Sequence, residues 1–242
     1  MFELRSGLVR FSVLILSMIT SLTPPSRVHA ETGVTEKEIK IGVSIPLSGP
    51  AAGLGIGNQR GFETYFKKLN AKGGIHGRKI SLTVKDDGYE PQRTATNTQD
   101  LITKENSFVL FNFVGTPTSR AAVPLARKFG VPYLFPFTGA EFLRTPADPF
   151  IYNLRASYFN ETEFLVNHFV EDLGIKRIGI FSQNDAYGDA GLSGVVKALA
   201  KRNLKLTGEG RYKRNTLEIS QGFEILEKAA PDAIILIGAY EP

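Results

Sequence analysis

The stretch FVLFNFVGTPTSRAAVPLARKFGVPYLF, residues 108–135, decides the fold. Its apolar run over 108–114 predicts a strand, and a second apolar run over 131–135 predicts another. Between the two runs, small and apolar residues recur at helical spacing, at Ala122, Leu125, Ala126 and Phe129. A strand, a helix and a second apolar strand in this order are typical of a parallel sheet covered by helices on both faces.

The same alternation extends in both directions along the chain. Further strands are expected at 39–45, 80–84, 151–154, 177–181 and 233–237, and further helices around 62–69, 164–173, 192–199 and 219–226. The pattern restarts near Asp148 to Ala156, which predicts an α/β protein of two lobes, 31–153 and 154–242. The chain ends at Pro242, directly after a strand that has the apolar composition of a central one, so the second lobe is expected to be incomplete.

Residues 1–30 have the pattern of a secretory signal peptide. Arg5 and Arg10 precede an apolar stretch over 11–22, and Val28-His29-Ala30 is a small-x-small cleavage pattern. We expect cleavage after Ala30 and an exported chain without stable membrane insertion. An uncleaved membrane anchor is the alternative.

The composition limits the partners. The sequence has no cysteine, which excludes disulfides, thiolate metal sites and a lipid-modified N-terminal cysteine. Removal of residues 1–30 would lower the formal net charge from +5 to +3, and the charges are scattered, so no nucleic acid partner is expected.

Enzyme motifs are incomplete wherever they begin. GLGIGNQRG, residues 53–61, lacks the third glycine of a dinucleotide loop, and GTPTSRA lacks the lysine of a phosphate loop. Asp86-Asp87-Gly88 has no calcium-loop spacing around it, and His76 and His168 belong to no metal or triad motif. No catalysis, cofactor or metal is expected.

The segment GTPTS, residues 115–119, suits a small anion. The sequence predicts Thr116 as the helix N-cap and Pro117 as the first helical residue, with Thr118 and Ser119 beside unpaired backbone N–H groups. Such a helix start favours a carboxylate. Thr116 could equally cap its own helix and touch no ligand.

Other candidate segments follow the other expected strands. SIPLSGPAAG, VGTPTS and PFTGAE lie at such positions in the first lobe, and SQNDAYGD and IGAYEP in the second. Because open parallel sheets bind ligands at the carboxyl ends of their strands, these segments predict a cleft with hydroxyls on one wall and tyrosine rings on the other. Tyr187 and Tyr240 could also be ordinary packing residues.

Four stretches of the chain carry a resemblance to a known family. IGVSIPLSGPAAGLG, NAKGGIHGRKISLTVKDDGYEP, GVPYLFPFTGA and GIKRIGIFSQNDAYGDAG resemble the periplasmic leucine/isoleucine/valine-binding proteins of ABC importers. The resemblance implies two Rossmann-like lobes, joined by three crossings and closing on a small solute. It also implies that residues beyond Pro242 complete the second lobe.

The resemblance implies ligand contacts on both lobes. They fall on or beside these residues: Gly115, Thr116, Thr118, Thr138, Gly139, Tyr187 and Tyr240. Two positions that carry a hydroxyl in the family are glycines here, Gly115 and Gly139, and a family tyrosine falls on Leu54. Selectivity for branched-chain amino acids is therefore not implied, and another small carboxylate, an amide or an aromatic acid would suit the site.

The sequence thus predicts a periplasmic solute-binding protein that delivers an amino acid or related small carboxylate to an ABC permease. The alternatives are the extracellular sensor domain of a receptor and a truncated remnant that binds nothing.

Overall fold

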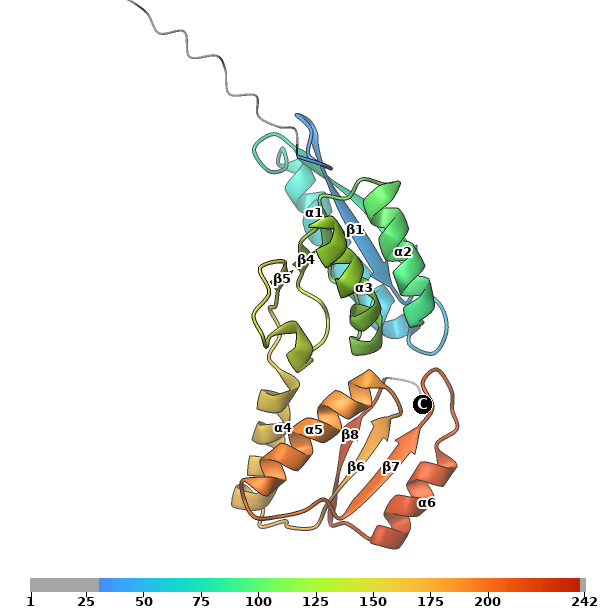
Figure 1. Cartoon of the computed structure of the whole chain (residues 1–242), viewed down its shortest axis with the longest axis vertical. Coiled ribbons are helices and arrows are strands. Elements are labelled where there is room, and N and C mark those ends of the chain that lie inside the picture. Colours follow the sequence, from blue (N-terminus) through green and yellow to red (C-terminus); the bar gives the residue numbers. More distant parts are fainter. Residues whose placement is uncertain (1–30, 240–242) are drawn as a thin grey trace, which may run out of the picture.

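The computed structural model describes residues 31–239. The predicted signal peptide and Tyr240 lie outside these residues. Within them the chain is an α/β protein with two parallel sheets, one above the other in Figure 1. This confirms the α/β architecture that the alternating pattern predicts.

The first sheet has the strand order β2-β1-β3-β4-β5, and all its pairs are parallel. Its strands are β1 (Glu38–Ile45), β2 (Lys79–Asp86), β3 (Val109–Phe111), β4 (Tyr133–Leu134) and β5 (Ile151–Tyr152). Helix α1 (Ala52–Ala71) covers one face, and α2 (Pro91–Thr103) and α3 (Thr116–Phe129) pack together over the other. A 3₁₀ turn, η1 (Glu141–Leu143), lies between β4 and β5.

The second sheet has three parallel strands in the order β7-β6-β8. They are β6 (Ile178–Gln183), β7 (Gly208–Tyr212) and β8 (Ala233–Ile237). The helices are α4 (Tyr158–Asn167), which continues into the π-helical turn η2 (His168–Asp172), α5 (Ala186–Ala200) and α6 (Ser220–Ala229). Helices α4 and α5 pack together on one face, and α6 covers β6 and β7 on the other.

Strand β8 lies at the edge of this sheet among the described residues, although it has the apolar composition of a central strand. Ile235 and Ile237 point into the core, whereas Ile234 and Leu236 on the opposite face are 42% and 66% exposed. One face of β8 is therefore apolar and open to solvent.

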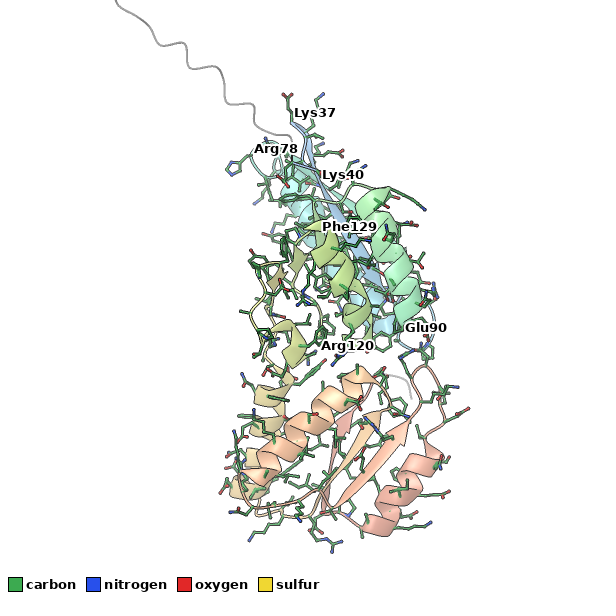
Figure 2. All side chains as sticks on the ribbon, in the orientation of Figure 1. Lys37, Lys40, Arg78, Glu90, Arg120 and Phe129 are labelled. Atoms are coloured by element: carbon green, nitrogen blue, oxygen red, sulfur yellow. The ribbon has the colours of Figure 1, made fainter. Side chains whose placement is uncertain are left out.

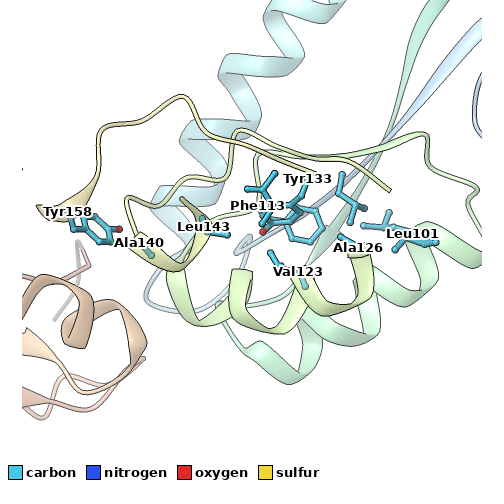
Figure 3. Close-up of a cluster of buried hydrophobic side chains, with 12 residues drawn as sticks. Leu101, Phe113, Val123, Ala126, Tyr133, Ala140, Leu143 and Tyr158 are labelled. Atoms are coloured by element: carbon cyan, nitrogen blue, oxygen red, sulfur yellow. The ribbon is translucent and has the colours of Figure 1, made fainter. Parts of the chain in front are cut away.

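Two buried clusters hold the first lobe together, one on each face of its sheet. Figure 3 shows the cluster that packs against α3. In it, Phe113 and Tyr133 meet edge to face, with 5.2 Å between their ring centroids. Tyr158, the first residue of α4, joins this cluster at its end nearest the second lobe. The cluster therefore extends to the junction where the candidate site lies.

No helix within residues 31–239 combines the length and the apolar character that a membrane span requires.

Candidate functional site

A cavity of about 200 Å³ lies between the carboxyl ends of the two sheets. Its lining residues all follow strands. They are Leu54, Tyr89, Val114, Gly115, Phe137, Arg155, Tyr158, Tyr187, Gly238 and Ala239. This is the position at which open parallel sheets bind ligands. Both sheets contribute to the wall, so a molecule in the cavity would contact both lobes.

The helix start at GTPTS differs by one residue from the prediction. Gly115, not Thr116, is the N-cap of α3; its φ is 104°, and no side chain caps the helix. Thr116 is therefore the first helical residue and Pro117 the second. Two features of this position require glycine. A Cβ there would lie 2.2 Å from Cε2 of Tyr89, and glycine adopts a φ of 104° without the strain that other residues have. Tyr89 thus packs directly on the helix start.

The three predicted threonine hydroxyls are used inside the protein. Thr116 and Thr138 share a hydrogen bond of 2.7 Å between their hydroxyls, and Thr118 donates to the carbonyl oxygens of Val114 and Gly115. All three side chains are fully buried and lie outside the cavity lining. The predicted wall of hydroxyls is therefore absent from this cavity, because local hydrogen bonds already satisfy these groups.

Gly139 also lies outside the lining. A Cβ there would be 2.8 Å from the Tyr158 ring and 2.7 Å from the carbonyl oxygen of Ala156. The Gly139 carbonyl accepts a 2.7 Å bond from the backbone N–H of Tyr158. Gly139 therefore permits the close packing that brings Tyr158 to the cavity. Of the six predicted residues within 31–239, Gly115 and Tyr187 line the cavity, and Tyr240 lies outside the described residues.

Arg155 is the charged residue of the lining, and two rings hold it. Its guanidinium carbon lies 5.3 Å from the ring centroids of both Phe137 and Tyr158. Its Nε and Nη2 each donate a 3.0 Å bond to the Glu161 carboxylate. Burial lowers the pKa of Arg155, but the ion pair with Glu161 more than offsets this, and the pKa is raised. Arg155 therefore stays charged at the cavity wall.

Tyrosine rings form most of the remaining wall. Tyr158 and Tyr187 lie 5.5 Å apart between ring centroids, tilted by 46°. Burial raises the pKa of the Tyr187 hydroxyl and that of the Tyr89 hydroxyl. Both hydroxyls are therefore neutral at physiological pH, so the rings add no negative charge beside Arg155.

The position of Tyr89 is fixed by a buried carboxylate. Asp87 accepts hydrogen bonds from the Tyr89 backbone N–H at 2.9 Å, from Ser44 Oγ at 2.8 Å and from Thr94 Oγ1 at 3.1 Å. Burial raises the pKa of Asp87, and these donors partly oppose the rise. Tyr89 itself has a φ of 61° and is 3% exposed. This network turns the chain after β2 so that the Tyr89 ring enters the site.

A loop of the second lobe reaches across to the first. Arg214 donates to Glu90 at 2.9 Å and to Asp185 at 3.2 Å, and Asn215 donates to the Gly88 carbonyl at 3.1 Å and to Glu90 at 2.6 Å. Figure 2 shows Glu90 at the end of the first lobe that faces the second. These bonds join the two lobes beside the cavity.

Among residues 31–239, no group of three or more potential metal-ligating side chains comes together. The described lining offers one cation, several rings and a cavity that is partly open to solvent. It is suited to holding a small molecule.

Sequence reasoning missed Arg155, Tyr89, Phe137 and Tyr158. Arg155 lies in the segment where the two lobes were expected to meet, and Tyr158 lies two residues beyond that segment. Tyr89 and Phe137 lie in segments that follow strands. Only their positions after strands could have identified these residues as lining the cavity. Their residue types could not, since aromatic residues and arginines are common in ordinary packing.

Comparison with known proteins agrees with this architecture. A family model described as "Periplasmic binding protein" matches residues 38–241. The chain is 25% identical over 206 residues to Leu/Ile/Val-binding protein homolog 7 of Brucella abortus, covering 82% of this chain and 51% of that protein. It is 28% identical over 188 residues to Leu/Ile/Val-binding protein BraC3 of Rhizobium johnstonii, covering 76% and 48%.

A solved structure is also similar. It is the crystal structure of a possible leucine/isoleucine/valine-binding protein from Rhodopirellula baltica, with 39% identity and a TM-score of 0.81, covering 87% of this chain and 58% of that one. The chain spans about half the length of the curated relatives it matches. These relatives and this neighbour are named as binding proteins, not enzymes, as the sequence predicts.

Proposed function

The chain belongs to the periplasmic binding protein family, and from this premise we propose that it is the solute-binding protein of an ABC importer. It binds an amino acid or a related small carboxylate in the cavity between its lobes, taken as 31–153 and 154–242. It acts in the periplasm after cleavage of residues 1–30, and it presents its solute to a permease. The relatives are named as Leu/Ile/Val-binding proteins, which supports a small solute of the amino acid type as the ligand.

The observation that carries the proposal is the two-sided lining of the cavity. Tyr89, Gly115 and Phe137 come from the first lobe, and Tyr187 and Gly238 come from the second. A ligand that contacts both lobes stabilises the arrangement in which they are close together, because it gains contacts there that an open arrangement lacks. We propose Gly115 and Tyr187 as contact residues, with Tyr240 as a further candidate.

Thermal unfolding with a panel of amino acids, amides and small organic acids tests the proposal. A solute present at about 100 times its dissociation constant adds roughly 2.7 kcal/mol to the stability of the folded state. We expect at least one solute to raise the melting temperature. The same solute should have a smaller effect on Tyr187→Ala and an undiminished effect on Tyr65→Ala, whose side chain is exposed on α1. The proposal is refuted if no solute shifts the transition, or if the shift survives unchanged in Tyr187→Ala.

A further inference from the structure

The geometry points to Arg214 as a positioning residue that holds the two lobes together and fixes two tyrosines of the cavity wall relative to each other. Arg214 joins the residue after Tyr89 in the first lobe to the residue two before Tyr187 in the second. This inference rests on the proposed function, because it concerns how the lobes close on a solute. It does not depend on which solute that is.

The loop between β7 and α6 makes the contact from the second lobe. Arg214 and Asn215 lie at its start, and Asn215 has a φ of 57°, in the left-handed region that asparagine tolerates. Arg214 Nη2 donates to one carboxylate oxygen of Glu90 at 2.9 Å, and Asn215 Nδ2 donates to the other at 2.6 Å. Asn215 Nδ2 also donates to the Gly88 carbonyl oxygen at 3.1 Å. The second lobe therefore binds both oxygens of a first-lobe carboxylate.

These contacts fix the segment that carries Tyr89. Gly88 and Glu90 flank Tyr89, and Glu90 (Figure 2) is the N-cap residue of α2. The Tyr89 ring lines the cavity. Burial raises the pKa of the Tyr89 hydroxyl most, and the charge of Asp185 raises it further, so this first-lobe ring lies within the field of a second-lobe carboxylate. The contacts from the second lobe therefore act on both sides of a residue that already faces that lobe.

The other end of the Arg214 guanidinium holds the segment that carries Tyr187. Arg214 Nη1 donates to Asp185 Oδ2 at 3.2 Å, and Asp185 is the N-cap residue of α5. Asp185 Oδ1 accepts from the backbone N–H of Tyr187 at 2.9 Å, so this carboxylate fixes the first turn of α5. Tyr187 lies in that turn and lines the cavity. We call Arg214, Glu90 and Asp185 the interlobe bridge, because they connect the supports of two lining rings from opposite lobes.

The interlobe bridge is charged and partly shielded from water. The side chains of Arg214, Asp185 and Glu90 are 23%, 7% and 43% exposed. Burial lowers the pKa of Arg214, but its hydrogen bonds with Glu90 and Asp185 more than offset this, and the pKa is raised. Arginine suits the position because its planar guanidinium donates to two carboxylates in fixed directions, whereas the ammonium group of lysine is a compact point charge. The bridge therefore favours the arrangement in which the lobes are close.

The interlobe bridge and a bound solute favour the same arrangement. Tyr89 and Tyr187 line one cavity when the lobes are close, and the Arg214–Glu90 ion pair requires the same closeness. Two interactions that stabilise the same state strengthen each other, and this coupling is reciprocal. Loss of the bridge should therefore open the lobes more often in the protein without solute, and it should release a bound solute faster.

Electron spin resonance distances between two spin labels test the bridge without any solute, in the protein expressed from the full chain. The sequence has no cysteine, so labels can be attached at Thr96→Cys and Glu224→Cys, exposed positions on α2 and α6. Arg214→Ala should move the distance distribution to longer values, and Arg214→Lys should move it less. The matched control is Arg211→Ala, whose ion pairs stay within the second lobe and which should leave the distribution unchanged.

Two further comparisons separate the bridge from a general loss of stability. Glu90→Gln, in the other lobe, removes the charge and keeps the shape, and combined with Arg214→Ala it should lengthen the distances little more than Arg214→Ala does alone. Raising the salt from about 0.1 M to about 1 M shortens the Debye length from about 10 Å to about 3 Å, and this should lengthen the distances in the unaltered protein but not in Arg214→Ala. The inference is overturned if Arg214→Ala has the distribution of the unaltered protein, or if the two substitutions act additively.

Release of radiolabelled L-leucine after dilution tests the consequence for binding. L-leucine is the probe because the relatives are named as Leu/Ile/Val-binding proteins, and if it does not bind, the panel solute that raises the melting temperature most takes its place. Arg214→Ala should raise the dissociation rate about fivefold or more, the lower end of ordinary coupling between sites, and Arg211→Ala should not.

The outcomes separate this inference from the proposed function. A solute that binds the unaltered protein and leaves Arg214→Ala no faster overturns the inference, and solute binding between the lobes stands. If no solute of the panel binds, the proposed function fails, and the label distances still decide whether Arg214 holds the lobes together.

Discussion

Alanine at Gly115 should be strongly destabilising, because the helix start and the Tyr89 ring occupy the same small space. The added Cβ would lie 2.2 Å from Tyr89 Cε2 and 2.9 Å from Thr118 Oγ1. A non-glycine residue at a sparsely populated φ costs about 1–3 kcal/mol. Forcing extra volume into a packed core costs a further 1–3 kcal/mol or so. We expect Gly115→Ala to lower the free energy of unfolding by about 2–6 kcal/mol in total.

Urea unfolding followed by circular dichroism measures this loss. The matched control is Gly57→Ala: Gly57 lies in α1 with nothing within 4 Å of the added Cβ, so alanine should stabilise the protein by about 0.5–1 kcal/mol. In a Tyr89→Ala background the contacts with the ring disappear and the 2.9 Å contact with Thr118 Oγ1 remains. Gly115→Ala should then cost less than in the unaltered protein, and at least the roughly 1–3 kcal/mol of the backbone strain. The reasoning is refuted if Gly115→Ala costs less than about 0.5 kcal/mol, the usual range of neutral surface substitutions.

Three further substitutions test the joint between the lobes, the loop after β2 and the edge strand. Arg214→Ala should increase the radius of gyration measured by small-angle X-ray scattering, because it removes the ion pair with Glu90 that joins the lobes. Arg211→Ala, whose ion pairs stay within the second lobe, should not change the radius of gyration. Burial alone would raise the pKa of Asp86, but its hydrogen bonds outweigh burial and hold the pKa well below the ordinary 3.8. The ionised Asp86 carboxylate therefore stabilises the fold above pH 3.8, and this stabilisation is lost as the pH falls below 3.8. Asp86→Asn should therefore lower the melting temperature at pH 7 and reduce its fall below pH 3.8, and an unchanged acid profile would contradict this. Ile235→Ala should cost about 2–5 kcal/mol in urea unfolding and Leu236→Ala about 0.5 kcal/mol or less; equal costs would contradict the assigned faces of β8.

The fold was largely predictable where strands are apolar, and less so elsewhere. The pattern did not reveal α2, because its buried face carries two threonines, Thr94 and Thr98, beside Leu101 and Ile102. It did not reveal β7 either. That strand reads GEGRY, and its glycines are needed where α6 packs closely: a Cβ at Gly210 would lie 2.2 Å from the carbonyl oxygen of Gly222. Tertiary packing selects these residues against local propensity.

The candidate site was predictable in position but only partly in chemistry. The cavity lies at the strand ends, and Gly115 and Tyr187 are among its lining residues. That they contact a ligand stays a prediction. Hydroxyl residues near a helix start suggested ligand contacts. Whether such a threonine faces a ligand or a backbone carbonyl depends on which residue begins the helix, and here the helix begins one residue earlier than predicted. Thr118, for example, bonds to the carbonyl oxygen of Val114 four residues earlier. The sequence pattern does not contain that register.

A crystal structure of the protein grown with the solute that raises its melting temperature most tests the central claim most directly. The account predicts density for one solute molecule between the two sheets, in contact with Gly115 of the first lobe and Tyr187 of the second. Density for that solute elsewhere on the chain, with the cavity filled by water alone at saturating solute, would contradict it.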